Sequence, residues 1–207
     1  MKKYHPLVEK AEPWASLTAL MLAIVALLIS VFGVNVATNQ LTFAVNSYNC
    51  QLIHNEAETL NRQQGTVTLA VLELNHDLNW SNSLLETKDK YLTQNYTISG
   101  RFKTQALRDL LKSGIVTNDD YIELILKIIG FKETANNSLD ETFSAYIVIR
   151  DSEQSREFLK LSNSKMLNLI GQSSNGIHSV TSDLNNLKNI LRHNIDKTNE
   201  KLVQNNC

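Results

Sequence analysis

Histidine has the most versatile side-chain chemistry in this chain, yet its five copies form no catalytic or metal-binding pattern. No HExxH sequence is present, and no histidine stands near a cysteine at the spacing that zinc sites use. Two histidines share a predicted helix but lie 15 residues apart, which is too far for one metal ion. We therefore expect no metal site and interpret all five as solvated or at the edge of a helical bundle: His5, His54, His76, His178 and His193.

The sequence also lacks a phosphate-binding loop and an activated nucleophile. The seven glycines never cluster, so there is neither a Walker A loop nor a dinucleotide-binding pattern, and no G-x-S-x-G elbow occurs. The acidic pairs Asp119-Asp120 and Asp140-Glu141 stand in the first turns of expected helices, where acidic residues are favoured, so helix capping explains them without catalysis. We predict no catalytic residue and no cofactor, and a protein that is not an enzyme.

Two cysteines, Cys50 and Cys207, are too few for a disulfide scaffold or for a zinc site made of cysteines alone. In an oxidising compartment they could bond to each other or across a dimer, but we favour free thiols. A direct bridge between two copies of Cys50 is disfavoured, because this residue lies off the apolar stripe formed by Tyr48 and Leu52.

Residues 14–37 form the most apolar stretch of the chain, and no Asp, Glu, Lys or Arg occurs between Glu12 and Glu56. As a helix these residues span about 36 Å, which is enough to cross a bilayer. A buried core helix of this length would normally carry a polar face. A cleaved signal peptide has a shorter apolar core, and it has a small residue where Asn35 stands. We predict an uncleaved signal-anchor helix that crosses the membrane once.

Basic residues are distributed unevenly about this span, with three lysines before it and none after it until Arg62. Because Lys and Arg near a span favour the cytoplasmic side, residues 1–13 are predicted to form a short cytoplasmic tail. Residues 38–207 then lie outside the cytoplasm, in the periplasm or the extracellular space. The three lysines are Lys2, Lys3 and Lys10.

Seven small residues in the span repeat at spacings of 3, 4, 3, 4, 3 and 4, so that on a helix they share one face. Hydrophobicity does not drive helices together in lipid, whereas small side chains let two backbones approach closely. We therefore predict that the span pairs, either with its own copy or with the transmembrane helix of another protein. This small-residue seam comprises Ser16, Ala19, Ala23, Ala26, Ser30, Gly33 and Ala37.

An apolar stripe at helical spacing continues beyond the span and predicts a juxtamembrane helix over residues 38–65. We expect this helix to be continuous with the span and to end or kink at Gly65. The stripe consists of Leu41, Val45, Tyr48 and Leu52.

Residues 66–207 are predicted to form an extracytoplasmic helical bundle, because apolar residues recur there at spacings of 3 and 4 and no proline interrupts them. Gly114, Gly130 and Gly171 are interpreted as helix ends. The segment 145–149 fits either a helix or a strand, and we favour a helix. The expected helices cover residues 67–92, 102–113, 119–129, 156–170 and 177–203. The fold class is mostly all-α, with one transmembrane helix followed by a coiled-coil-like bundle.

The formal net charge of −1 argues against nucleic acid as a partner, since phosphate binding requires a clear excess of Lys and Arg. We expect a single-pass membrane scaffold or accessory subunit that pairs through the small-residue seam and presents its helical domain outside the cytoplasm. Its partners are the lipid bilayer and either further copies, as a homo-oligomer, or another transmembrane helix. The alternatives are a ligand-sensing signalling component that acts through a partner, and an oligomerising membrane effector.

Overall fold

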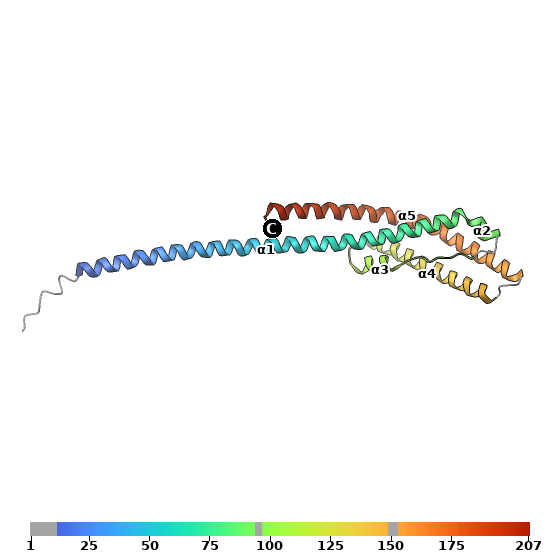
Figure 1. The fold of residues 1–207 in the computed structure, drawn as a ribbon, viewed down its shortest axis with the longest axis horizontal. Coiled ribbons are helices and arrows are strands. Elements are labelled where there is room, and N and C mark those ends of the chain that lie inside the picture. The colour runs from blue at the N-terminus through green and yellow to red at the C-terminus, as the bar shows by residue number, and fades with distance from the viewer. Residues whose placement is uncertain (1–11, 94–96, 149–152) are drawn as a thin grey trace, which may run out of the picture. The chain divides into compact units, whose positions relative to one another are not determined.

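The computed structural model describes residues 12–93, 97–148 and 153–207, and within them every regular element is an α-helix (Figure 1). The predicted all-α class, with a long apolar helix first and further helices after it, is confirmed. The helices are α1 (Glu12–Glu86), α2 (Lys88–Thr93), α3 (Gln105–Lys112), α4 (Asp119–Val148) and α5 (Glu153–Gln204).

The chain divides into two compact units. The terminal unit contains residues 1–54 and 201–207, and the helical unit contains residues 55–200. Helix α1 runs without interruption from one unit into the other, and so does α5. The expected boundary at residue 65, between a juxtamembrane helix and the bundle, is therefore not a helix end.

The helical unit is held together by a core to which α1, α3, α4 and α5 all contribute. Its apolar side chains recur at spacings of 3 and 4 along each long helix, which is the pattern that buries one face of an α-helix. The predicted helix over residues 177–203 lies within α5 and contributes Ile177, Val180, Leu184 and Leu191 to this core. The largest fully buried apolar side chains are Val67, Leu74, Leu107, Leu110, Ile125, Ile170, Ile177, Val180 and Leu184.

Three glycines that we interpreted as breaks or ends lie inside helices. Gly65 is within α1, Gly130 within α4 and Gly171 within α5, so the predicted helix ends at these positions are wrong. A glycine inside a helix costs only about 1 kcal/mol relative to alanine. The buried apolar faces on both sides of each glycine outweigh that cost. By contrast, the predicted end at Gly114 is confirmed, and its positive φ of 67° is the left-handed conformation that terminates α3.

One further boundary differs from expectation, and one ambiguous segment is resolved. The helix predicted over residues 67–92 is divided, because α1 ends at Glu86 and α2 resumes at Lys88. The segment 145–149 is helical up to Val148, as we favoured, and Ile149 lies outside the described residues.

Helix α3 begins at Gln105 rather than at Phe102, because a side chain from α4 holds the preceding backbone out of the helix. The Asn136 side-chain amide donates to the Phe102 carbonyl oxygen at 3.0 Å, and its oxygen accepts from the Phe102 N–H at 2.9 Å. Both backbone groups are therefore satisfied without a helical turn. The Phe102 ring is buried and meets Trp80 edge to face, with ring centroids 4.8 Å apart.

Gly100 is a glycine whose place a side chain could not take without meeting an aromatic ring. Its φ is +116°, and a Cβ atom built on it would lie 2.7 Å from the Trp80 indole nitrogen. That nitrogen donates to the Ser99 carbonyl oxygen at 3.2 Å, so the indole covers this part of the backbone. Any other residue at position 100 would meet both an unfavourable backbone conformation and an aromatic ring.

Alanine is expected to have opposite effects at these two kinds of glycine. Gly130→Ala and Gly171→Ala should each raise the free energy of unfolding by about 0.5–1 kcal/mol, because a helical backbone and open space receive the new methyl group. Gly100→Ala should lower it by about 1–3 kcal/mol through backbone strain and contact with Trp80. Thermal unfolding followed by circular dichroism measures all three. A stabilising Gly100→Ala would contradict the packing described above.

Candidate functional site

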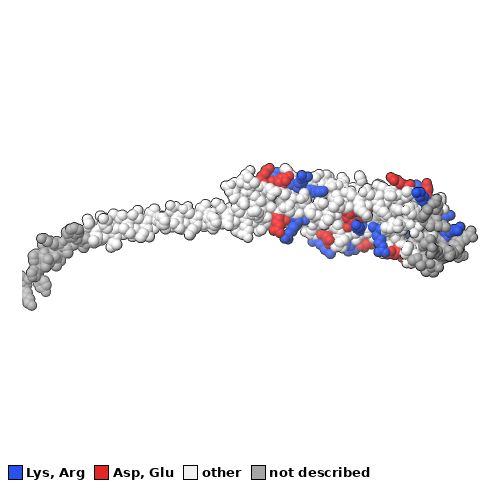
Figure 2. Space-filling model, in the orientation of Figure 1, with Lys and Arg blue, Asp and Glu red and all other residues white. Residues whose placement is uncertain are grey.

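The first part of α1 has the properties of a membrane span. It is long and apolar enough to cross a bilayer by length and composition, and it lies near the N-terminus. None of its most apolar window is buried inside the protein, whereas the core helix of a soluble protein would be mostly buried. Figure 2 shows this part of the helix free of charged atoms. These features indicate membrane insertion.

The small-residue seam lies on this exposed stretch of α1. All seven of its residues are helical and exposed, so their spacing brings them onto one face. Ser30 donates its hydroxyl to the Ala26 carbonyl oxygen at 2.8 Å, which satisfies that polar group within its own helix. Nothing lies within 4 Å of the position that a Cβ atom on Gly33 would occupy. The seam therefore presents a shallow surface that a second helix can approach closely.

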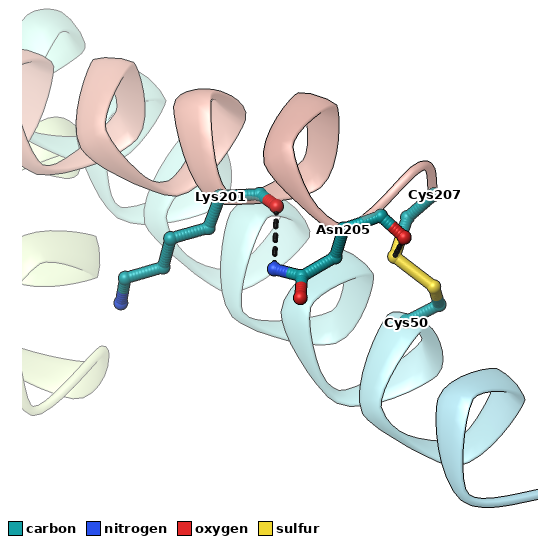
Figure 3. Close-up of a disulfide and its surroundings, with 4 residues drawn as sticks. All are labelled: Cys50, Lys201, Asn205 and Cys207. Carbon is teal, nitrogen blue, oxygen red and sulfur yellow. Dashed lines mark hydrogen bonds between the residues drawn. A yellow bond between two sulfur atoms is a disulfide. The ribbon is translucent and has the colours of Figure 1, made fainter. Parts of the chain in front are cut away.

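A disulfide joins Cys50 of α1 to Cys207 at the end of the sequence, with Cα atoms 5.4 Å apart (Figure 3). Our preference for free thiols is therefore wrong, since no cysteine is free in the structure. The bond closes a loop with a sequence separation of 157 residues. The bond joins the two segments of the terminal unit, residues 1–54 and 201–207.

The turn that delivers Cys207 to this bond is a Schellman motif. Asn206 has φ of 53°, the left-handed conformation that asparagine tolerates better than most residues. The Cys207 N–H donates to the Leu202 carbonyl oxygen at 2.9 Å, and the Asn206 N–H donates to that of Val203 at 3.2 Å. The Asn205 side chain donates to the Lys201 carbonyl oxygen at 2.7 Å (Figure 3). The final helical carbonyl groups are thus satisfied while the chain turns back.

A buried cluster of charges in the helical unit was not identified from the sequence. Lys132 of α4 is fully buried, and its ammonium nitrogen lies 2.6 Å from Asp77 Oδ2 and 3.5 Å from Glu73 Oε1, both from α1. The same nitrogen donates to the Lys103 carbonyl oxygen at 2.9 Å. Glu73 accepts the Ala106 N–H through its other oxygen at 2.9 Å. Two carboxylates and one ammonium group are therefore held together away from water.

Two neighbours extend this buried charge cluster. Ser81 is fully buried one helical turn beyond Asp77, and its hydroxyl has no hydrogen-bond partner among the described residues. His76 lies on the open side, with Nδ1 3.3 Å from Asp77 Oδ1 and a side chain 54% exposed. In the sequence, Asp77 and Ser81 stand at positions of the 3-and-4 repeat of α1 that are otherwise apolar, which is a signal for buried polar residues.

Several surface grooves lie in the helical unit, and two of them border buried or partly buried polar groups. One, of about 610 Å³, is bordered by Glu73, His76, Lys103 and Asp109 next to the buried charge cluster. The other, of about 500 Å³, contains Tyr121, whose hydroxyl donates to the Val180 carbonyl oxygen at 3.2 Å. Burial, with a smaller contribution from the negative charge of Asp183, raises the pKa of Tyr121 above its ordinary value. Grooves of this size are large enough for a small molecule.

No group of three or more histidine, cysteine, aspartate or glutamate side chains that could hold a metal ion occurs in the described part of the chain. Among the described residues, His76 borders the buried charge cluster, with Nδ1 3.3 Å from Asp77 Oδ1. No protein family matches the chain, and no curated protein or solved structure is similar to it.

Proposed function

We propose that the protein is a single-pass membrane scaffold or accessory subunit that pairs through the small-residue seam and presents its helical unit outside the cytoplasm. The observation that carries this proposal is the exposed seam on an apolar, uncharged helix of membrane-spanning length. Close backbone approach along such a seam is a main source of helix pairing in lipid. Because α1 continues unbroken into the helical unit, pairing in the membrane brings two helical units, or the unit and a partner protein, into proximity.

Two independent features support the orientation. The lysines precede the span, which favours a cytoplasmic N-terminus with an uncleaved signal anchor. The disulfide between Cys50 and Cys207 lies beyond the span, and disulfides persist in oxidising compartments such as the periplasm and the cell exterior. Residues 38–207 therefore function on the extracytoplasmic side.

A ligand-sensing component is the second candidate, and the 610 Å³ groove beside the buried charge cluster favours it. A ligand in this groove would lie against Glu73, which belongs to the buried charge cluster, and against His76, which borders it. A stoichiometric small molecule in protein purified from native membranes would support sensing. A stoichiometric partner protein would support the scaffold.

Leucine substitutions in the seam are expected to reduce pairing of the span strongly. Ala26→Leu and Gly33→Leu each add a bulky side chain at the contact face and force two helices apart, which removes many small packing contacts. Each should lower the self-association signal of the span by about tenfold, measured with a reporter of helix association in membranes.

Matched substitutions on the lipid-facing sides provide the control. Leu27→Ile and Phe32→Leu exchange one large apolar residue for another off the seam, so they should leave the signal nearly unchanged. Equal losses from both sets would show that the pairing face is placed wrongly. An unmutated span that does not self-associate would exclude pairing with its own copy, and a cross-linker placed at Ala23 would then identify the partner helix.

A further inference from the structure

Beyond the predicted span, one face of α1 carries four large apolar side chains that the described structure leaves uncovered. They are spaced by 4, 3 and 4 residues and so share a face of the helix. Eight of the 15 residues from 38 to 52 are Asn, Gln, Ser or Thr, which places this part of α1 in water rather than in hydrocarbon. This outer apolar stripe consists of Leu41, Val45, Tyr48 and Leu52, which are 66%, 49%, 62% and 48% exposed.

The C-terminal end of the chain does not cover the outer apolar stripe. Cys50 lies two residues from both Tyr48 and Leu52, and two residues correspond to about 200° of rotation around a helix. The disulfide to Cys207 is therefore on the side of α1 opposite the stripe. The disulfide holds Cys207 on that side of α1, so the outer apolar stripe stays accessible.

The outer apolar stripe continues the face of the small-residue seam. Leu41 follows Ala37, the last residue of the seam, by four positions, and α1 is helical throughout. Residues four apart are neighbours on one helix face. A second helix that packs in parallel against the seam therefore meets the outer apolar stripe when it emerges from the bilayer.

The absence of charge on this part of α1 fits a second copy of this chain as the occupant of the stripe. In a parallel pair of identical helices, each residue near the two-fold axis lies beside its own twin, so any charge there would meet its like. From Pro13 to Asn55 the helix contains no Asp, Glu, Lys or Arg (Figure 2). The Asn, Gln, Ser and Thr side chains that flank the stripe each offer a donor and an acceptor, so they can bond to their own twins.

We propose that two copies of the chain pair in parallel along one continuous face of α1, from the small-residue seam in the membrane to the outer apolar stripe in water. This inference rests on the proposed pairing through the seam. It adds the identity of the partner, an identical chain, and an extension of the contact by about 22 Å beyond the bilayer. The apolar side chains exposed in one copy become buried against those of the other.

Charge exchange at Val45 tests the proposal in full-length chains with two different tags, co-expressed in membranes and analysed by co-capture. Val45→Glu and Val45→Lys, each expressed alone in both tagged forms, should weaken self-association by about tenfold, because like charges then meet at the contact. Co-expression of the Glu form with the Lys form should restore capture to near the unmutated level. Phe43→Glu is the control, since Phe43 is 76% exposed and lies about 200° around the helix from Val45.

The outcomes separate this inference from the proposed function. If the unmutated chain self-associates and Gly33→Leu weakens capture, but Val45→Glu behaves like Phe43→Glu, pairing through the seam stands and its extension into water is overturned. If both Val45 variants weaken capture and their combination does not restore it, the in-register second copy is overturned. Absence of capture for the unmutated chain would overturn the identical chain as partner, and the cross-linker at Ala23 would then decide whether the seam pairs with another transmembrane helix. Circular dichroism of each variant establishes that the helices are intact.

Discussion

Replacing Lys132 by methionine is expected to lower the free energy of unfolding by about 3–5 kcal/mol. Lys132 is fully buried between Asp77 and Glu73, with its ammonium nitrogen 2.6 Å and 3.5 Å from their carboxylate oxygens. Methionine fills much of the same space but carries no charge. The two carboxylates would then remain buried without a counter-charge, which is among the most costly changes in a protein interior. Urea unfolding of the full chain in detergent micelles, followed by circular dichroism, measures the loss.

An exposed ion pair on the same helix provides the matched control. Lys127 lies 2.6 Å from Glu123, and their side chains are 71% and 64% exposed, so Lys127→Met should leave the unfolding midpoint nearly unchanged. Asp77→Asn in the Lys132→Met background should recover part of the lost stability, because it removes one of the two uncompensated charges. Equal midpoints for the Lys132 and Lys127 variants would refute the burial of the cluster.

The apolar faces of the helices could be predicted from the sequence wherever apolar residues occupy successive core positions. In α5, Ile177, Val180 and Leu184 follow one another at spacings of 3 and 4 and are all fully buried. The pattern alone is sufficient there, because each residue gains stability from burial whichever helix packs against it. The span of α1 could be predicted for a similar reason, since length and apolarity are local properties.

The buried charge cluster could not be predicted in this way. The core positions of α1 are spaced by 3, 4, 3, 4 and 3 residues, and all are buried: Val67, Ala70, Leu74, Asp77, Ser81 and Leu84. A search for apolar residues alone skips Asp77 and Ser81 and so shifts the predicted face toward Leu78 and Leu85, which are only partly buried. The side chain that makes burial of Asp77 tolerable is Lys132, which is remote in sequence. Local periodicity carries no information about such a partner.

Glycines misled the prediction of helix ends for a related reason. Intrinsic helix propensity acts over a few residues and contributes about 1 kcal/mol at a single glycine. Packing against other helices acts over the whole length of α4 or α5 and contributes far more, through buried residues on both sides of Gly130 and Gly171. Gly114 differs because its φ is positive and α3 does end there. Only the tertiary structure distinguishes these cases.

Removing the disulfide with Cys207→Ser is expected to lower the free energy of unfolding by about 5 kcal/mol, a value comparable to that for Lys132→Met. The reason lies in the unfolded chain. The bond between Cys50 and Cys207 closes a loop with a sequence separation of 157 residues, and a long loop restricts the unfolded ensemble strongly. Cys50→Ser and the double variant should show the same loss as Cys207→Ser, since each removes the same bond. Urea unfolding with and without a reducing agent measures the effect.

The same bond reports on the compartment in which residues 38–207 function. When cells grown without added reductant are lysed in denaturant, a thiol-reactive polyethylene glycol reagent should leave the chain unmodified, because both cysteines are bonded. After reduction it should modify two cysteines, and Cys207→Ser should yield one without reduction. A dimer that appears only on non-reducing gels would instead indicate a bond between copies. Complete modification before reduction would show that both thiols are free in cells. Cysteines in the cytoplasm are kept as free thiols, so that result would contradict both the disulfide and the extracytoplasmic placement of residues 38–207.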